Sequence, residues 1–99
     1  MNFEQLNGIT IKQGFEKFHA ENPRVFDLFV EQVNLALKRG KKKLSAKMII
    51  NWIRWNVFLE TTDKHFKIND AYQSYYAREF AKRNPHLSNI FEFRKLRNE

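Results

Sequence analysis

Lysine and arginine side chains gather in the middle of the sequence, where their cationic groups could contact phosphate. Residues 1–40 carry five Lys or Arg and five Asp or Glu, whereas residues 41–60 carry five and one. The excess begins at the run Lys38-Arg39-Gly40-Lys41-Lys42-Lys43. Contacts of such side chains with phosphate dominate nucleic-acid affinity. The formal charge of +7 therefore favours an acidic partner, of which nucleic acid is the commonest.

The lysine run also has a simpler explanation. Lys38 and Arg39 fall at the expected end of a helix, where cations interact favourably with the helix dipole. The lysines at 41–43 come just before Ser45, so a phosphate could meet both their ammonium groups and the free N–H groups of the next helix. Phosphate contact and simple solvation explain these three lysines equally well.

Basic residues recur on the polar faces of two expected helices, 45–60 and 71–83, and near the C-terminus. Phe58 and Tyr75 lie beside basic residues on those faces, so they could stack on unpaired bases. The residues predicted to contact nucleic acid are Lys41, Lys42, Lys43, Lys47, Asn51, Arg54, Ser74, Tyr75, Arg78, Lys82, Arg94, Lys95 and Arg97.

A catalytic or metal site needs convergent side chains, and the sequence contains no motif that would bring them together. The three histidines are dispersed, whereas a metal site needs three or four ligands. The carboxylates that could pair for hydrolysis are spread over a loop, a cap and a helix, and no phosphate-binding or nucleophile-elbow motif is present. The sequence therefore predicts a protein that is not an enzyme and that holds no metal and no cofactor.

Two helices are expected in the first 40 residues. Ile11, Phe15 and Phe18 recur at helical spacing and predict a helix over 10–20. Asn22-Pro23 provides an N-cap and a proline at the first helical position, and Gly40 provides a C-terminal stop. One face of this second helix is apolar and predicted to be buried; its members are Phe26, Phe29, Val30, Val33, Ala36 and Leu37.

The helix expected from Ser45 is apolar on two opposite faces. One side carries Met48, Trp52, Trp55 and Leu59, and the other carries Ile49, Ile50, Ile53 and Val57. A helix of this kind is typical of the centre of a domain. Replacing either tryptophan by alanine is therefore expected to cost about 3–5 kcal/mol.

The remaining chain predicts a helix between two short strands. Residues 65–68 and 90–94 alternate as strands do and could pair as a ribbon, and Asn69 or Asp70 caps a helix over 71–83 that ends at Asn84-Pro85. A ribbon beside a reading helix is compatible with a winged-helix arrangement. We therefore expect a mainly α fold of about four helices with a minor two-stranded β element.

The length of 99 residues suits a single domain spanning 1–99, with residues 1–9 as a flexible N-terminal arm and 95–99 as a basic tail. No stretch approaches the roughly 20 apolar residues of a membrane span, and no leader-like apolar region occurs near the N-terminus. The absence of cysteine fits a reducing compartment. A protein of the cytoplasm that does not enter a membrane is expected.

A distinctive string is Phe66-Lys67-Ile68-Asn69 followed by Tyr76-Ala77-Arg78. With other short strings over about residues 15–95, it resembles a widespread family of small uncharacterised proteins of bacteriophage and prophage genomes. The resemblance implies a phage-related origin and a host-cytoplasm location. It implies no activity and no site residue.

Two functions follow from these observations. The first is a non-enzymatic nucleic-acid-binding protein, with DNA favoured over RNA, that makes phosphate contacts through a basic surface within residues 41–97. The second is a small protein-binding module, an inhibitor or adaptor that docks on an acidic host protein. Leu28 and Leu35 lie on the outer side of their helix, so either a monomer or a homodimer through these two leucines is expected.

Overall fold

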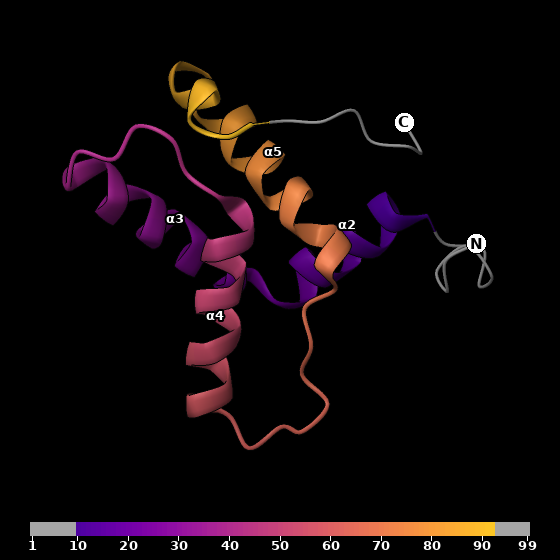
Figure 1. Ribbon diagram of the computed structural model, residues 1–99. Coiled ribbons are helices and arrows are strands. Elements are labelled where there is room, and N and C mark those ends of the chain that lie inside the picture. The colour runs from indigo at the N-terminus through magenta and orange to yellow at the C-terminus, as the bar shows by residue number, and fades with distance from the viewer. Residues whose placement is uncertain (1–9, 93–99) are drawn as a thin grey trace.

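Four α-helices carry the fold in the computed structural model, which describes residues 10–92 (Figure 1). They are α2 (Ile11–Glu21), α3 (Pro23–Lys38), α4 (Ala46–Glu60) and α5 (Gln73–Arg83), and two 3-10 helices, η1 (Asp70–Tyr72) and η2 (Pro85–Ile90), flank α5. The mainly helical class and the four helices expected from the sequence are confirmed for this part of the chain. The predicted arm at 1–9 and tail at 95–99 lie outside the described residues.

Helix boundaries follow local capping chemistry. Thr10 and Gln13 form a reciprocal capping box at the start of α2, and the Ser45 hydroxyl accepts a hydrogen bond from the Met48 amide at the start of α4. Pro23 occupies the first turn of α3 as predicted. Asn22, however, does not cap α3 with its side chain, because its Nδ2 donates to the carbonyl of Phe18 at the end of α2.

The end of α3 is a glycine-terminated Schellman turn. Gly40 has φ +84°, and the amides of Gly40 and Lys41 donate to the carbonyls of Leu37 and Ala36. Only glycine adopts this backbone conformation at little cost. The turn stops α3 and directs the lysine run into the loop before α4.

The core is centred on α5. Tyr76 and Phe80 are almost fully buried there, and they pack with Phe29 and Val33 of α3 and Ile53 of α4. The Tyr76 ring also lies 4.8 Å from that of Phe15 in α2, at nearly a right angle. Because α5 meets α2, α3 and α4, it takes the central place that the sequence assigned to the helix at 45–60.

The sequence predicts that both apolar faces of α4 are buried, and this prediction is wrong for one of the two faces. Ile50 and Ile53 are buried, and Ile49 and Val57 pack against the core. The opposite side is exposed by 73% at Met48, 39% at Trp52, 59% at Trp55 and 62% at Leu59. Since α4 lies at one side of the bundle (Figure 1), no described element covers this second face.

The predicted strand at 65–68 is wrong as well. Residues 64 and 65 form a turn, and the alternating Phe66 and Ile68 anchor a loop: Phe66 packs on Phe18, and Ile68 is buried in the core. Residues 85–90 form η2, and the β contact within 10–92 is an isolated parallel bridge between Leu44 and Phe91. Residues 93 and 94 lie outside the described range, and neither the β ribbon nor the winged-helix arrangement is confirmed.

The two leucines suggested as a dimer face differ in environment. Leu28 is half-buried and packs against the edge of the core, whereas Leu35 is 44% exposed. They therefore do not form one open surface on α3.

Candidate nucleic-acid interface

The loop between α3 and α4 presents the predicted lysines at one end of the molecule. Lys41, Lys42 and Lys43 are all exposed. The loop is fixed at its far end, because the Leu44 amide donates to the Ile90 carbonyl at 2.8 Å and Lys43 Nζ donates to the Asn89 carbonyl at 2.7 Å. Lys43 thus ties the loop to η2, whereas the side chains of Lys41 and Lys42 make no hydrogen bond or ion pair with any described residue.

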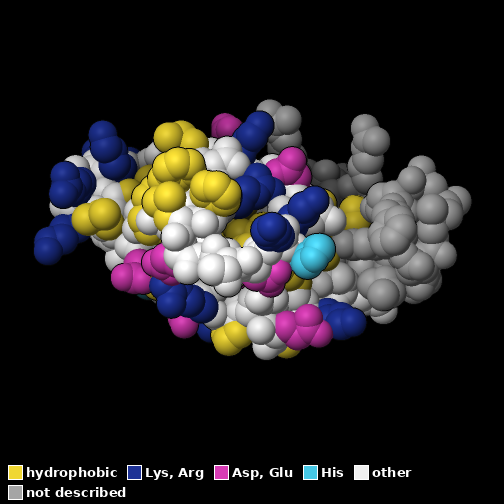
Figure 2. All heavy atoms as spheres, turned by 90° about the horizontal axis from the view of Figure 1, so that it is seen from below, with side chains coloured by type: hydrophobic (Ala, Val, Ile, Leu, Met, Phe, Trp, Pro, Cys, Tyr) yellow, Lys and Arg dark blue, Asp and Glu magenta, His cyan; other side chains and the backbone are white. Residues whose placement is uncertain are grey.

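Acidic residues are absent from the sequence around this loop. No Asp or Glu occurs from Gln32 to Leu59, a span that contains Lys38, Arg39, Lys41, Lys42, Lys43, Lys47 and Arg54. Lys47 is exposed on the first turn of α4 and has no ion pair within residues 10–92. In Figure 2, dark blue side chains gather at the left end of the molecule, where α3 ends. The span therefore carries seven cationic side chains and no carboxylate of its own, while the exposed Glu92 follows Phe91, which forms a bridge to Leu44.

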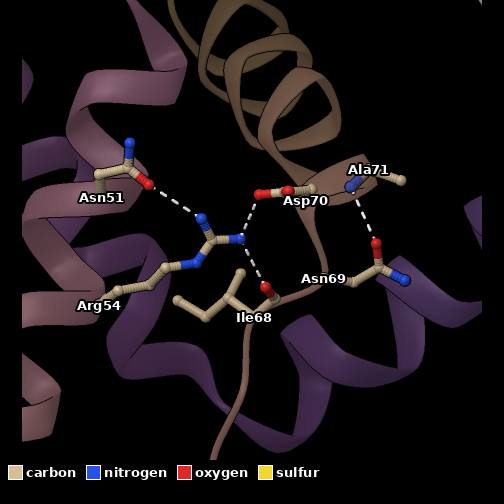
Figure 3. Close-up of polar contacts among 6 residues, drawn as sticks. All are labelled: Asn51, Arg54, Ile68, Asn69, Asp70 and Ala71. Atoms are coloured by element: carbon tan, nitrogen blue, oxygen red, sulfur yellow. Dashed lines mark hydrogen bonds and ion pairs between the residues drawn. The ribbon is translucent and has the colours of Figure 1, made fainter.

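Arg54 and Asn51, which the sequence placed on the contact face, form an internal clamp instead (Figure 3). Arg54 Nη2 donates to the Ile68 carbonyl and to Asp70 Oδ1, both at 2.6 Å, and Nη1 donates to Asn51 Oδ1 at 2.9 Å. The Arg54 side chain is 32% exposed. The guanidinium therefore joins α4 to the start of η1 and holds the 61–69 loop, and it is not free to bind a ligand.

The face of α5 expected to read nucleic acid is largely covered. Tyr75 is only 9% exposed and stacks on Phe15 with ring centroids 5.5 Å apart. Ser74 and Arg78 are half-buried, and only Lys82 is exposed. The prediction of an open polar face is wrong at Tyr75, because α2 packs against this side of α5. Arg94, Lys95 and Arg97 lie outside the described residues.

Two lysines that the sequence analysis did not select lie on the 61–69 loop. Lys64 and Lys67 are exposed and, with Phe58, line a hollow of about 610 Å³ between the end of α4 and the loop. The acidic residues Asp63 and Asp70 line the same hollow, so its charge is mixed. Lys64 precedes the residues 65–68 that the sequence analysis interpreted as a strand, and Lys67 lies within them, so neither was recognised as a surface cation.

The exposed face of α4 is the second feature that sequence reasoning missed. We call Met48, Trp52, Trp55 and Leu59 the α4 stripe. Phe58 lies beside it, 69% exposed, with its ring 5.8 Å from that of Trp55. Figure 2 shows hydrophobic side chains gathered over this helix. The helical wheel placed these residues on one face, but the wheel alone could not show that this face is open.

Metal-ligating side chains do not converge in the part of the chain that the structure describes. No group of three or more His, Asp or Glu side chains within residues 10–92 could hold a metal ion. None of the helices in that range has the length and apolar character that crossing a membrane requires.

Comparison of the chain with protein-family models, with curated proteins and with solved structures finds no match.

Proposed function

We propose that this protein is a non-enzymatic nucleic-acid-binding protein whose α3–α4 loop contacts the phosphate backbone. The observation that carries the proposal is the acid-free span from Gln32 to Leu59, which exposes the side chains of Lys41, Lys42 and Lys47 without a partner among the described residues. Unneutralised ammonium groups of this kind displace counterions from phosphates.

Binding through this loop is dominated by phosphate and carries little sequence information. Phosphate contacts position a protein, whereas base contacts specify its site. A buried Tyr75 and a clamped Arg54 leave few side chains to read base edges. The winged-helix arrangement, with residues 90–94 beside α5, is a more specific version of this proposal. The lysine contacts do not depend on it. A phage-related origin and a cytoplasmic location belong to the proposal in the same way.

The test compares two double variants that remove equal charge. Lys41→Gln/Lys42→Gln acts on the loop, and Lys12→Gln/Lys17→Gln acts on exposed lysines of α2. Anisotropy with fluorescent duplex DNA, single-stranded DNA and RNA is measured between about 50 and 200 mM salt. Since each phosphate contact contributes about 0.9 to the log–log salt slope on duplex DNA, the loop variant should lower the slope by up to about 1.8. The α2 variant should leave the slope close to that of the unmodified chain.

Two outcomes would contradict the proposal. Absence of binding to all three ligands at the lowest salt would exclude the nucleic-acid function. Equal losses in both variants would show that net charge, and not the loop, determines affinity. In the first case the second candidate, docking on an acidic protein, becomes the better explanation. Its test is whether the same lysines are needed to retain an acidic protein after nuclease digestion.

A further inference from the structure

The α4 stripe has the spacing of a helix–helix seam. Met48, Trp52, Trp55 and Leu59 follow one another at intervals of four, three and four residues, which places them in one line along the helix. Apolar residues recur at the same alternating intervals of three and four along the contact line of paired helices. The stripe points away from the bundle, because Ile50 and Ile53 on the opposite side of α4 lie in the core.

The stripe is also symmetric about its midpoint. A long aliphatic side chain stands at each end, Met48 and Leu59, and a tryptophan stands on each side of the centre. A two-fold axis through that centre, perpendicular to α4, would place Met48 opposite Leu59 of a second copy and Trp52 opposite Trp55 of a second copy. An interface of this kind uses the same patch on both chains, as two-fold dimers do.

The helix dipoles favour the same antiparallel arrangement, because a parallel pair would align the two dipoles unfavourably. Lys47 and Glu60 lie at opposite ends of α4 and, at about 100° per residue, on opposite flanks of the stripe, so neither charge falls on its contact line.

We infer that the chain forms a symmetric homodimer in which two α4 helices pack antiparallel along the α4 stripe. Burying about 100 Å² on each of five large side chains per copy, Phe58 included, gives roughly 1,000 Å² in total. That area is at the lower limit for a specific interface. We therefore expect a dissociation constant in the micromolar range. This inference does not rest on nucleic-acid binding, and its test contains no nucleic acid.

The association is measured on the full chain by sedimentation equilibrium from low micromolar to several hundred micromolar protein. Tryptophan emission provides a second readout, because the two tryptophans of the chain both belong to the stripe. Their emission should move to shorter wavelength as concentration rises and the rings leave water. Trp55→Glu should weaken association by at least tenfold, while circular dichroism shows an unchanged helical fold.

Leu35→Glu is the matched control. Leu35 is 44% exposed on α3 and outside the stripe, so its replacement should leave association unchanged. A monomeric chain at the highest concentration would overturn the inference. Loss of association in Leu35→Glu together with its retention in Trp55→Glu would also overturn it, and would place the interface on α3.

Introduced cysteines test the orientation, because the sequence contains no cysteine of its own. Met48→Cys chains are mixed with Leu59→Cys chains and oxidised. The antiparallel dimer should give mainly the mixed disulfide. Predominant linkage of each variant to itself would contradict the antiparallel arrangement.

Discussion

At the scale of single residues, Tyr76 combines deep burial with an unused hydroxyl. Its side chain is fully buried between α2 and α3, and its Oη has no hydrogen-bond partner among residues 10–92. Burial raises the pKa of the Tyr76 phenol far above its usual value of about 10, and the neighbouring Tyr72 raises it further. The folded chain thus holds this phenol strongly in its neutral form.

Tyr76→Phe should raise the free energy of unfolding by about 1 kcal/mol near neutral pH, because a buried hydroxyl without a partner costs its desolvation. The pH dependence has a definite sign. The pKa of Tyr76 is higher in the folded chain than in the unfolded chain. Its contribution to the free energy of unfolding is therefore fully present below about pH 10. Above that pH the contribution is lost, because the tyrosine of the unfolded chain ionises first. Urea unfolding of both chains between neutral pH and about pH 11 checks this. A stability curve for the variant that falls as steeply as that of the parent would contradict it.

Arg54 is the residue that fixes the 61–69 loop. Arg54→Met should lower the free energy of unfolding by about 2 kcal/mol, because it leaves the Ile68 carbonyl and the Asp70 carboxylate without their charged donor. Chemical denaturation gives the change, and hydrogen exchange should show faster opening of the loop. Arg24→Met is the control: the Arg24–Glu60 pair is 68% and 57% exposed, so its loss should cost less than about 1 kcal/mol.

At the scale of elements, α4 behaves as a half-buried helix. Trp55→Ala should change the free energy of unfolding by less than about 1 kcal/mol, because its side chain is 59% exposed, whereas Trp52→Ala should cost more, because Trp52 is 39% exposed. Phe29→Ala, at 0% exposure on α3, should cost about 3–5 kcal/mol. Unfolding is followed by circular dichroism at submicromolar protein, where the proposed dimer dissociates. A Trp55→Ala loss as large as that of Phe29→Ala would show that the stripe is buried within one chain.

The helices could be predicted from the sequence because their limits are set locally. Ser45 accepts from an amide three residues away, Gly40 adopts a backbone conformation that suits it, and Pro85 follows the last residues of α5. The exposure of the α4 stripe could not be predicted. A helical wheel shows which residues share a face, but only the packing of the other helices decides which faces are covered.

The 61–69 loop shows a different limit of sequence reasoning. Phe66 and Ile68 alternate with polar residues as in a strand, yet they serve as two anchors of an irregular segment. Its carbonyl at Ile68 is satisfied by Arg54 and not by a neighbouring strand. Alternation over four residues cannot distinguish these cases, because both bury every second side chain.

At the scale of the whole molecule, thickness explains why one face of α4 is open. The molecule measures 42 × 35 × 19 Å, and 19 Å corresponds to about two layers of helices. In two layers, a helix at the margin is covered on one side. The four large apolar residues of the stripe therefore face outward, where they are available to a second chain.

The candidate site could be predicted in part at this scale. The charge imbalance points to the acid-free middle of the chain, where Lys41, Lys42 and Lys47 are exposed. Which cations are available there depends on contacts between distant segments: Lys43 is held by Asn89, and Arg54 by Asp70. Such contacts have no local sequence pattern, so the sequence cannot distinguish a free lysine or arginine from one that is already bonded.

The tie between the α3–α4 loop and η2 bears on the order in which the chain folds. Neighbouring helices dock early, because their contacts span short stretches of sequence. The Lys43–Asn89 hydrogen bond joins residues 46 positions apart, and the docking of α5 on α3 and α4 brings these two segments together before the bond can form. We therefore expect the Leu44–Phe91 bridge to form together with the packing of the buried Phe91 on Phe29 and Phe80, once α5 has docked on α3.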